Sequence, residues 1–197
     1  MNQTIAFFDF DGTITRKDSF VDFVIFAVGR FAFLLGILIN SMTLLGYKLG
    51  YISNSIAKER LWSAFFRGWK AEEFQTAADR YSHEQMNKII RAEAVERIEW
   101  HKNKGHIVVV VTASLEPWLK LWCDKNGLEL IATKIEIDHG VLTGRFMTRN
   151  CYAGEKVNRI KEKYDLRQFK CIYAYGDSKG DFEMLNLADK KYFRKFK

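Results

Sequence analysis

The sequence predicts an α/β fold: a doubly wound, mostly parallel sheet of the Rossmann-like type with an inserted α-helical cap. Three short segments rich in apolar, β-branched or aromatic residues, at 5–8, 106–112 and 171–175, predict central strands covered on both faces. Each segment ends in carboxylate or hydroxyl residues, and ligands bind at the carboxyl ends of parallel strands. Between the first two segments apolar residues recur at helical spacing, which predicts a helical insertion.

Length, charge and cysteine content limit the possible functions. The 197 residues suffice for one core domain with a substantial insertion. A net charge of +7 favours anionic partners such as phosphorylated molecules or an acidic membrane surface. We find no nucleic-acid-binding motif and expect no nucleic-acid partner. The three cysteines lack metal-ligand spacing, and no signal peptide precedes the first strand, so we predict a cytoplasmic protein with reduced thiols.

Two carboxylates, Asp9 and Asp11, follow the first strand one residue apart. Gly12 comes next and permits a sharp change of backbone direction. In an open α/β sheet this position faces the ligand-binding crevice. A strand that runs into an ordinary Asp-Gly turn would give the same pattern, so the pair alone leaves both interpretations open.

The segment at 20–52 is strongly apolar, with 17 consecutive uncharged residues between Arg30 and Lys48. That length is the lower limit for a membrane-spanning helix. A single span would place the first strand and everything after residue 52 on opposite sides of the membrane. Three interpretations therefore remain: a buried helical cap, a membrane-surface or re-entrant hairpin bending near Asn40 and Ser41, and a two-pass hairpin.

Helical spacing continues beyond this segment. Apolar and basic residues alternate in an amphipathic pattern from residue 55 until Gly68 offers a break. Residues 71–104 contain neither Gly nor Pro and predict two helices or one long bent helix, which Gly105 ends. We therefore expect residues 16–90 to form the helical cap, and residues 1–15 and 91–197 to form the α/β catalytic core.

The second strand ends at Thr112, Ala113 and Ser114, before a helix expected at about residues 115–126. A helix N-terminus preceded by hydroxyl residues is a typical anion site. The simpler interpretation is that Ser114 is the N-cap of that helix. Residues 130–147 then predict a strand and a hairpin that turns at residues 138–140.

Lys156 lies in the first turn of a predicted helix that runs to about Tyr164. A cation gains nothing from the helix dipole at that position, which suggests another task for this lysine. The third central strand ends before Asp177 and Asp181, so a second strand end is acidic. The last eight residues carry five positive charges, which indicates a solvated end or a contact with anionic headgroups.

Taken together, these residues resemble the four-motif active site of the haloacid dehalogenase superfamily of phosphatases. The match consists of D-x-D-G-T, an apolar strand ending in Thr, a Lys, and G-D-x-x-x-D, and it spans nearly the whole chain. The resemblance implies that Asp9 is the nucleophile, forming an aspartyl-phosphate, and that Asp11 is the general acid and base.

The resemblance also implies a metal site and a phosphate site. Mg²⁺ would be bound by Asp9, the backbone carbonyl of Asp11, Asp177 and Asp181. The phosphoryl oxygens would contact residues at two further motifs, namely Thr112, Ala113 and Lys156.

The helical insertion narrows the resemblance to the phosphoserine-phosphatase-like branch, subfamily IB. Phosphoserine phosphatases generally have Ser where this chain has Gly12, and Glu where it has Asp18. The apolar block after the first motif and the run at 151–157 are more similar to lipid-phosphate phosphatases of the phosphatidylglycerophosphatase C type. We take Asp18 and Arg60 as candidates for substrate specificity.

Three functions follow from the residues and the resemblance. The first is a Mg²⁺-dependent phosphomonoester hydrolase acting on a lipid phosphate such as phosphatidylglycerophosphate, at the inner face of the cytoplasmic membrane, with contact through residues 20–52 and the basic C-terminus. The second is a phosphatase of a small soluble phosphomonoester, such as a phosphoserine-like compound or a sugar phosphate. The third is a non-catalytic module that binds a membrane or a protein partner.

Overall fold

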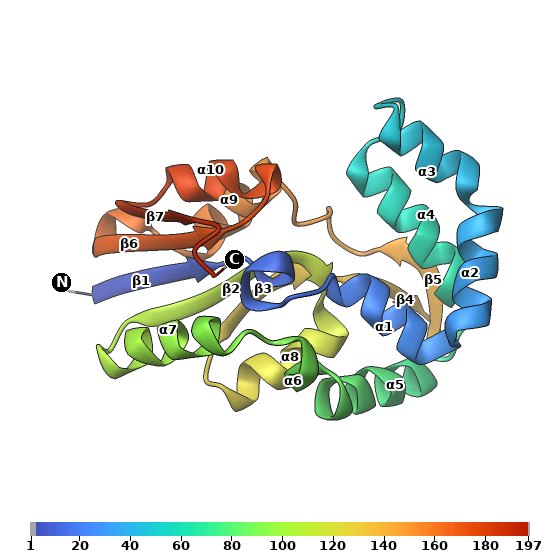
Figure 1. The fold of residues 1–197 in the computed structure, drawn as a ribbon, viewed down its shortest axis with the longest axis horizontal. Coiled ribbons are helices and arrows are strands. Elements are labelled where there is room, and N and C mark those ends of the chain that lie inside the picture. The colour runs from blue at the N-terminus through green and yellow to red at the C-terminus, as the bar shows by residue number, and fades with distance from the viewer. Residues whose placement is uncertain (1–2, 197) are drawn as a thin grey trace.

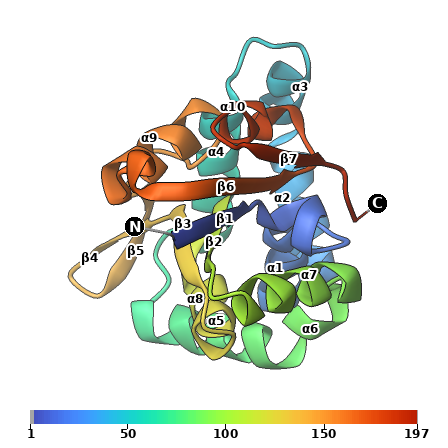
Figure 2. The same cartoon turned by 90° about the vertical axis from the view of Figure 1, so that its left-hand side faces the viewer.

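Five parallel strands form the central sheet of the computed structural model, which describes residues 3–196 (Figure 1). The sheet order is β3-β2-β1-β6-β7, so β1 lies between the two other predicted central strands (Figure 2). The predicted fold class is confirmed. The strands of this sheet are β1 (Gln3–Phe8), β2 (Ile107–Leu115), β3 (Glu129–Thr133), β6 (Phe169–Gly176) and β7 (Lys190–Phe193).

Helices cover both faces of the sheet (Figure 1). Ile5 and Phe7 of β1 belong to the apolar cluster on one face, and Ala6 and Phe8 belong to the cluster on the other. Successive side chains of a strand point to opposite faces, so a strand covered on both sides is apolar without alternation. The covering helices are α9 (Gly154–Lys163) and α10 (Phe182–Asn186) on the first face, and α7 (Ala92–Asn103) and α8 (Glu116–Lys125) on the second.

A helical segment separates β1 from α7. Thr15 and Ile90 form an antiparallel bridge at its two ends, where the chain leaves the sheet and returns. Backbone hydrogen bonds of 2.8 Å, from Arg16 to Ile89 and from Arg91 to Ile14, close the same crossing. The helices of this segment are α1 (Ser19–Val28), α2 (Arg30–Ile39), α3 (Ser41–Lys48), α4 (Asn54–Phe66), α5 (Ala71–Glu84) and α6 (Met86–Ile89).

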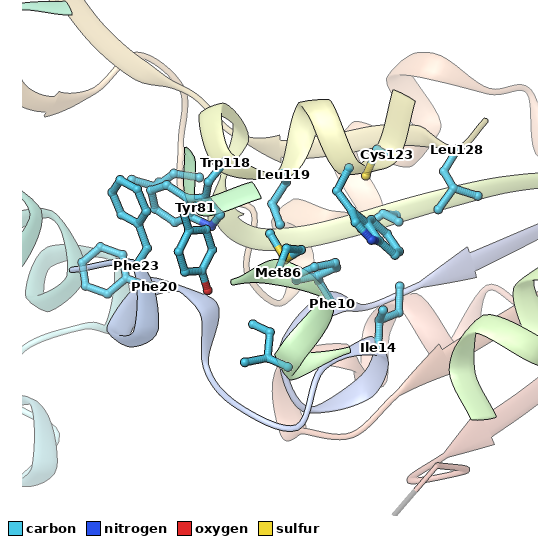
Figure 3. Packing of buried hydrophobic residues seen from close by; sticks show 14 of the residues in the cluster. Phe10, Ile14, Phe20, Phe23, Tyr81, Met86, Trp118, Leu119, Cys123 and Leu128 are labelled. Atoms are coloured by element: carbon cyan, nitrogen blue, oxygen red, sulfur yellow. The ribbon is translucent and has the colours of Figure 1, made fainter. Parts of the chain in front are cut away.

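One hydrophobic core joins this segment to the sheet (Figure 3). The ring of Phe23 in α1 stacks on that of Trp118 in α8, with centroids 4.3 Å apart. Tyr81 and Met86 extend the same cluster towards Phe10, which follows β1. The helical segment is therefore held to the sheet by packing as well as by its two chain connections.

A small antiparallel hairpin, β4 (Ile135–Asp138) and β5 (Val141–Phe146), packs against α4. Its turn at His139 and Gly140 lies where the sequence predicts it. Backbone hydrogen bonds link it to the helical segment, from Gly68 to Leu142 and from Leu142 to Trp69. Part of the second half of the chain therefore contacts the helical insertion as well.

Several elements differ from the sequence-based expectation. The long helical stretch after residue 70 is divided into three helices, α5, α6 and α7. The apolar segment has a bend of 116° between α1 and α2, at Gly29, in addition to the break at Asn40. The basic C-terminal segment is not simply a solvated end, because β7 pairs with β6 and Tyr192 stacks on Tyr175. Lys197 lies outside the described residues.

Candidate active site

The backbone after β1 turns sharply between Asp9 and Ile14. The amide of Asp9 donates to the carbonyl of Tyr175 on β6 at 2.9 Å, which fixes the strand end. Gly12 has φ of +81°, and a Cβ at this residue would lie 2.6 Å from a carboxylate oxygen of Asp177. Only glycine therefore allows the turn to pass this close to the second acidic strand end.

Three carboxylates meet at this edge of the sheet. One oxygen from each of Asp9, Asp177 and Asp181 lies within 4.8 Å of the other two. Asp181 is fixed because its Oδ2 accepts from the amides of Asp177 and Ser178, at 3.1 and 2.9 Å. A set of oxygen ligands suits a hard divalent cation. We call these three residues the acidic cluster.

Lys156 is the fixed cation of the site. Its Nζ donates to Asp9 Oδ1 at 2.5 Å and to Asp181 Oδ1 at 2.7 Å, and its side chain is 2% exposed. Burial lowers the pKa of Lys156, but the two carboxylates raise it by more, so the lysine stays charged. This contact explains its unusual position in the first turn of α9.

Burial and neighbouring charges shift the pKa values of Asp9 and Asp181 in opposite directions. Burial raises the pKa of Asp9 to about 7, although Lys156 acts in the opposite direction. Burial also raises the pKa of Asp181, but the contacts with Lys156 and Ser178 outweigh it, so that pKa lies below its usual value. The charge of Lys156 and the hydrogen bonds to these carboxylates thus offset part of the cost of burying Asp9 and Asp181.

Asp11 lies in a separate hydrogen-bond environment. Its Oδ1 accepts from the amide of Ser19 at 2.7 Å, and its Oδ2 accepts from the hydroxyl of Ser114. Burial and the nearby charge of Asp18 raise the pKa of Asp11. The acidic cluster does not include the Asp11 carboxylate. The predicted metal contact of the Asp11 backbone carbonyl stays a prediction.

Ser114 corrects an expectation. The strand β2 continues to Leu115, which is the N-cap of α8, so Ser114 does not cap that helix. Its hydroxyl instead contacts Asp11 and also lies 3.0 Å from the Ser19 hydroxyl. The sequence alone does not distinguish the two roles of Ser114, because a hydroxyl residue shortly before a helix can either cap the helix or contact a neighbouring carboxylate.

Thr112 and Ala113 lie at the end of β2 beside the acidic cluster and line the same pocket. The Thr112 hydroxyl is buried and accepts from the amide of Ser114 at 3.0 Å. The carbonyl of Ala113 accepts from Lys58 Nζ at 2.9 Å. Lys58 comes from α4 and was not singled out from the sequence. Burial lowers its pKa, although the charges of Asp11 and Asp18 oppose that shift.

A pocket of about 360 Å³ opens in front of these groups. Its polar lining includes the acidic cluster, Asp11 and Thr112, together with Lys58 and Lys156 as the cationic side chains among its described lining residues. Much of the remaining lining is apolar and comes from helices α1 to α4. These apolar residues are Phe20, Val21, Phe33, Ile37, Leu44, Leu61 and Phe65.

The two predicted specificity residues occupy different places. Asp18 lines this pocket and is also the N-cap of α1, accepting from the amide of Val21 at 3.1 Å. Arg60 instead lines a larger surface pocket of about 740 Å³ between α4 and the β4–β5 hairpin. That pocket contains no member of the acidic cluster, whereas Lys58 lines the pocket that does. A role of Arg60 in substrate specificity stays a prediction.

Comparison with known proteins gives matches over most of the chain. A family model for haloacid dehalogenase-like hydrolases matches residues 6–186. The chain is 32% identical over 193 residues to the protein CicA of Caulobacter vibrioides, with 96% of this chain and 85% of that protein covered. It is 30% identical over 198 residues to a probable phosphatase of Mycobacterium tuberculosis, with 94% and 67% covered.

Among solved structures, a substrate-bound phosphoserine phosphatase has the same fold, with a TM-score of 0.68 and 19% identity over 98% of this chain and 86% of that one. The predicted resemblance to the superfamily is confirmed, whereas similarity to phosphatidylglycerophosphatase C stays a prediction. The chain therefore belongs to the haloacid dehalogenase-like hydrolases and is an enzyme with the fold of phosphoserine phosphatase.

Proposed function

We propose that the protein is a Mg²⁺-dependent phosphomonoester hydrolase that acts through a phosphoryl group on Asp9. The observation that carries this proposal is that Asp9 and Asp11, one residue apart in the sequence, have different contacts. Asp9 belongs to the acidic cluster and contacts Lys156, whereas Asp11 is held apart by Ser19 and Ser114. One carboxylate is thus positioned to receive a phosphoryl group, and the other to exchange a proton with the leaving oxygen.

The acidic cluster fits a magnesium ion. Its three carboxylates offer hard oxygen ligands within 4.8 Å of one another, and Mg²⁺ typically binds through a few carboxylates while retaining several waters. When bound, the ion would offset the negative charge of the phosphate near these carboxylates. Lys156 supplies a fixed positive charge in contact with both Asp9 and Asp181.

The proposed reaction has two steps. A carboxylate oxygen of Asp9 bonds to phosphorus while the ester P–O bond breaks, and Asp11 gives its proton to the leaving oxygen. A water molecule then bonds to the same phosphorus, Asp11 takes the water's proton, and the Asp9–phosphate bond breaks to release phosphate. Thr112 and Ala113 lie at the end of β2, where they bind the phosphoryl oxygens, as Lys156 does.

We further propose a phosphate ester with a long apolar group, such as a lipid phosphate. The apolar part of the pocket lining supports this choice because the helical segment contributes these side chains to the same pocket as the acidic cluster. Phe33, Ile37 and Phe65 would lose contact with water when an acyl chain covers them, which stabilises the complex. A small polar leaving group would leave this wall uncovered.

A small amino-acid phosphate is the second candidate, and one specific observation favours it. Asp18 and Lys58 place one carboxylate and one ammonium group at the same pocket. This pair suits a zwitterionic leaving group, with its ammonium near Asp18 and its carboxylate near Lys58. The fold shared with phosphoserine phosphatase is compatible with this choice.

A panel of phosphomonoesters tests the proposal. The purified full-length protein is assayed with para-nitrophenyl phosphate, phosphoserine, a sugar phosphate and phosphatidylglycerophosphate, with and without Mg²⁺. We expect Mg²⁺-dependent phosphate release with the highest kcat/KM for the lipid phosphate. A preference for phosphoserine would favour the second candidate. No phosphate release from any ester would contradict the assignment of phosphatase activity.

A further inference from the structure

We propose that the outer face of α2 and α3 docks onto an anionic membrane surface. Both helices lie at the end of the molecule farthest from the amino ends of the sheet strands (Figure 1). We define the α2–α3 face as the exposed apolar side chains of α2 and α3, together with that of Leu49, which follows α3. These are Phe31, Leu34, Leu35, Leu38, Ile39, Met42, Leu45 and Leu49.

The spacing of these residues is that of one side of a helix pair. Leu34 and Leu38 are 64% and 68% exposed, and α2 has no buried residue. The opposite side of α2 faces inward, where Phe33 stacks against Phe65 of α4 with ring centroids 6.0 Å apart. The interpretation as a wholly buried cap is therefore wrong for α2. An exposed apolar surface of this kind typically marks an interaction site.

The charges around the α2–α3 face favour an anionic occupant. The sequence contains no Asp or Glu from residue 23 to 58, whereas Arg30 and Lys48 are exposed at the two ends of the apolar stretch. Basic residues beside an apolar face are attracted to acidic headgroups. Tyr47 and Tyr51 are also exposed, and tyrosine is enriched at membrane–water interfaces.

A second copy of the chain suits this surface less well. A symmetric dimer would place the same patch against itself. The two cations of each copy would then meet a surface without carboxylates, because none occurs in that segment. A membrane leaflet supplies both the acyl chains and the negative charges that such a patch lacks.

The docking mode is peripheral insertion at the interface. Within residues 3–196 no single helix is long and apolar enough to cross a membrane; α1 and α2 meet the length and composition limits only together, with a 116° bend between them. A helix whose one face is apolar and whose other face packs on protein lies in the plane of the interface. Phe33 and Ile37 of the same helix line the pocket, so docking brings the pocket next to lipid.

The test uses co-sedimentation of the full-length protein with vesicles of phosphatidylglycerol and phosphatidylcholine in equal parts, and with phosphatidylcholine vesicles. We expect binding to the anionic vesicles. The double variant Leu34→Gln/Leu38→Gln should weaken it at least about 10-fold because two apolar side chains lose their burial in lipid. The variant Arg30→Gln/Lys48→Gln should weaken it by about 10-fold, since each basic residue contributes to attraction by acidic lipids.

The matched control is Ile137→Gln/Met147→Gln. These apolar residues are 50% and 68% exposed and lie on and just after the β4–β5 hairpin, outside the α2–α3 face. We expect the control to bind vesicles like the wild type, and all variants to keep the wild-type melting temperature and activity on para-nitrophenyl phosphate.

Three outcomes would overturn the proposed docking surface. These are no vesicle binding by the wild type, a loss of vesicle binding in the control equal to that in the leucine variant, and a lipid-free dimer that the leucine variant dissociates. The proposal is independent of the chemistry: vesicle binding without any phosphatase activity would reject the proposed function alone. Phosphatase activity without vesicle binding would reject the docking surface alone.

Discussion

At the scale of single residues, Asp9 and Asp11 have different partners although only Phe10 lies between them. Asp9 has extended backbone directly after β1 and contacts Lys156, whereas Asp11 lies within the turn that follows and contacts Ser114. Gly12 continues this turn, and its missing Cβ leaves room for Asp177. The division of tasks between the two residues thus depends on backbone geometry as well as on side-chain type.

We expect Lys58→Met to lower kcat/KM at least about 10-fold, because a partly buried cation that contacts Ala113 near Asp11 is lost. The melting temperature should not fall, because burial lowers the pKa of Lys58 and its charged form is costly in the folded state. Steady-state kinetics and thermal unfolding measure the two effects. The control Arg60→Met should change neither. A loss of stability with unchanged activity would make Lys58 a structural residue.

The choice between Lys58 and Arg60 shows what the sequence leaves open at this scale. The two residues are two positions apart on α4, so they point about 160° away from each other. The sequence identifies a basic helix, but only its packing partners decide which basic residue faces the site. Asp9, Asp11 and the second acidic strand end were predictable because strand ends of one parallel sheet meet at one edge. Lys156 was predictable because a cation in the first turn of a helix is unfavourable without another partner.

At the scale of elements, the approach of α2 to α4 depends on Gly36. A Cβ at this position would lie 2.2 Å from Cε1 of Phe65. We therefore expect Gly36→Ala to lower the free energy of unfolding by about 1–3 kcal/mol through overpacking, despite the better helix propensity of alanine. Urea unfolding measures this.

The matched control is Gly154→Ala in α9, where an added Cβ meets no atom within 4 Å. We expect this variant to be as stable as the wild type or more stable, because alanine favours the helix. Equal stability of both alanine variants would show that Phe65 moves aside without cost, and would contradict close packing between α2 and α4.

The packing of α7 on the sheet makes stability depend on pH through His101. This residue is fully buried, and its ring nitrogens lie 3.0 Å from the Tyr175 hydroxyl and 2.8 Å from His106 Nδ1. Burial, with a contribution from Arg97, lowers its pKa to about 3. Between this value and about 6.5 only the unfolded state binds the proton, so stability falls as the pH falls through this range.

Urea unfolding of the wild type and of His101→Gln at pH 7 and pH 5 tests this linkage. The contributions of acid-sensitive groups that do not contact His101 cancel in the difference between the two proteins. From pH 7 to pH 5 the free energy of unfolding should fall by about 2 kcal/mol more in the wild type than in the variant. The slope is about 1.4 kcal/mol per pH unit below pH 6.5. A pH-independent difference would mean that His101 is protonated in the folded state.

The C-terminal strand shows which elements the sequence does not reveal. Strong β-branched runs predicted the central strands correctly, because burial on both faces requires them. β7 is an edge strand with exposed Lys190 and Lys191, so its composition looks like that of a solvated segment. Its pairing with β6 and the stacking of Tyr192 on Tyr175 are tertiary contacts that local pattern does not encode.

At the scale of the whole molecule, one continuous core holds the helical segment against the sheet while charges of like sign gather at the sheet's edge. We expect Mg²⁺ to raise the melting temperature, since a ligand at about 100 times its dissociation constant adds about 2.7 kcal/mol to stability. Thermal unfolding with and without Mg²⁺ measures this.

Asp177→Asn should lose most of this Mg²⁺-dependent rise, because it removes a charge of the acidic cluster. Asp124→Asn removes the same charge from an exposed position on α8 and should keep the rise. If both variants respond to Mg²⁺ like the wild type, the acidic cluster is not the metal site.

Covalent trapping tests the phosphoryl-transfer mechanism most directly. The protein is mixed with a rapidly hydrolysed phosphomonoester found in the panel, quenched in acid within one turnover, reduced with borohydride and mapped by mass spectrometry. Borohydride converts an acyl phosphate of aspartate into homoserine, so we predict homoserine at position 9, and none in Asp9→Asn, whose kcat should fall at least about 1,000-fold, a change of roughly 4 kcal/mol. Homoserine at another position, or an active Asp9→Asn enzyme, would contradict the assignment of Asp9 as the nucleophile.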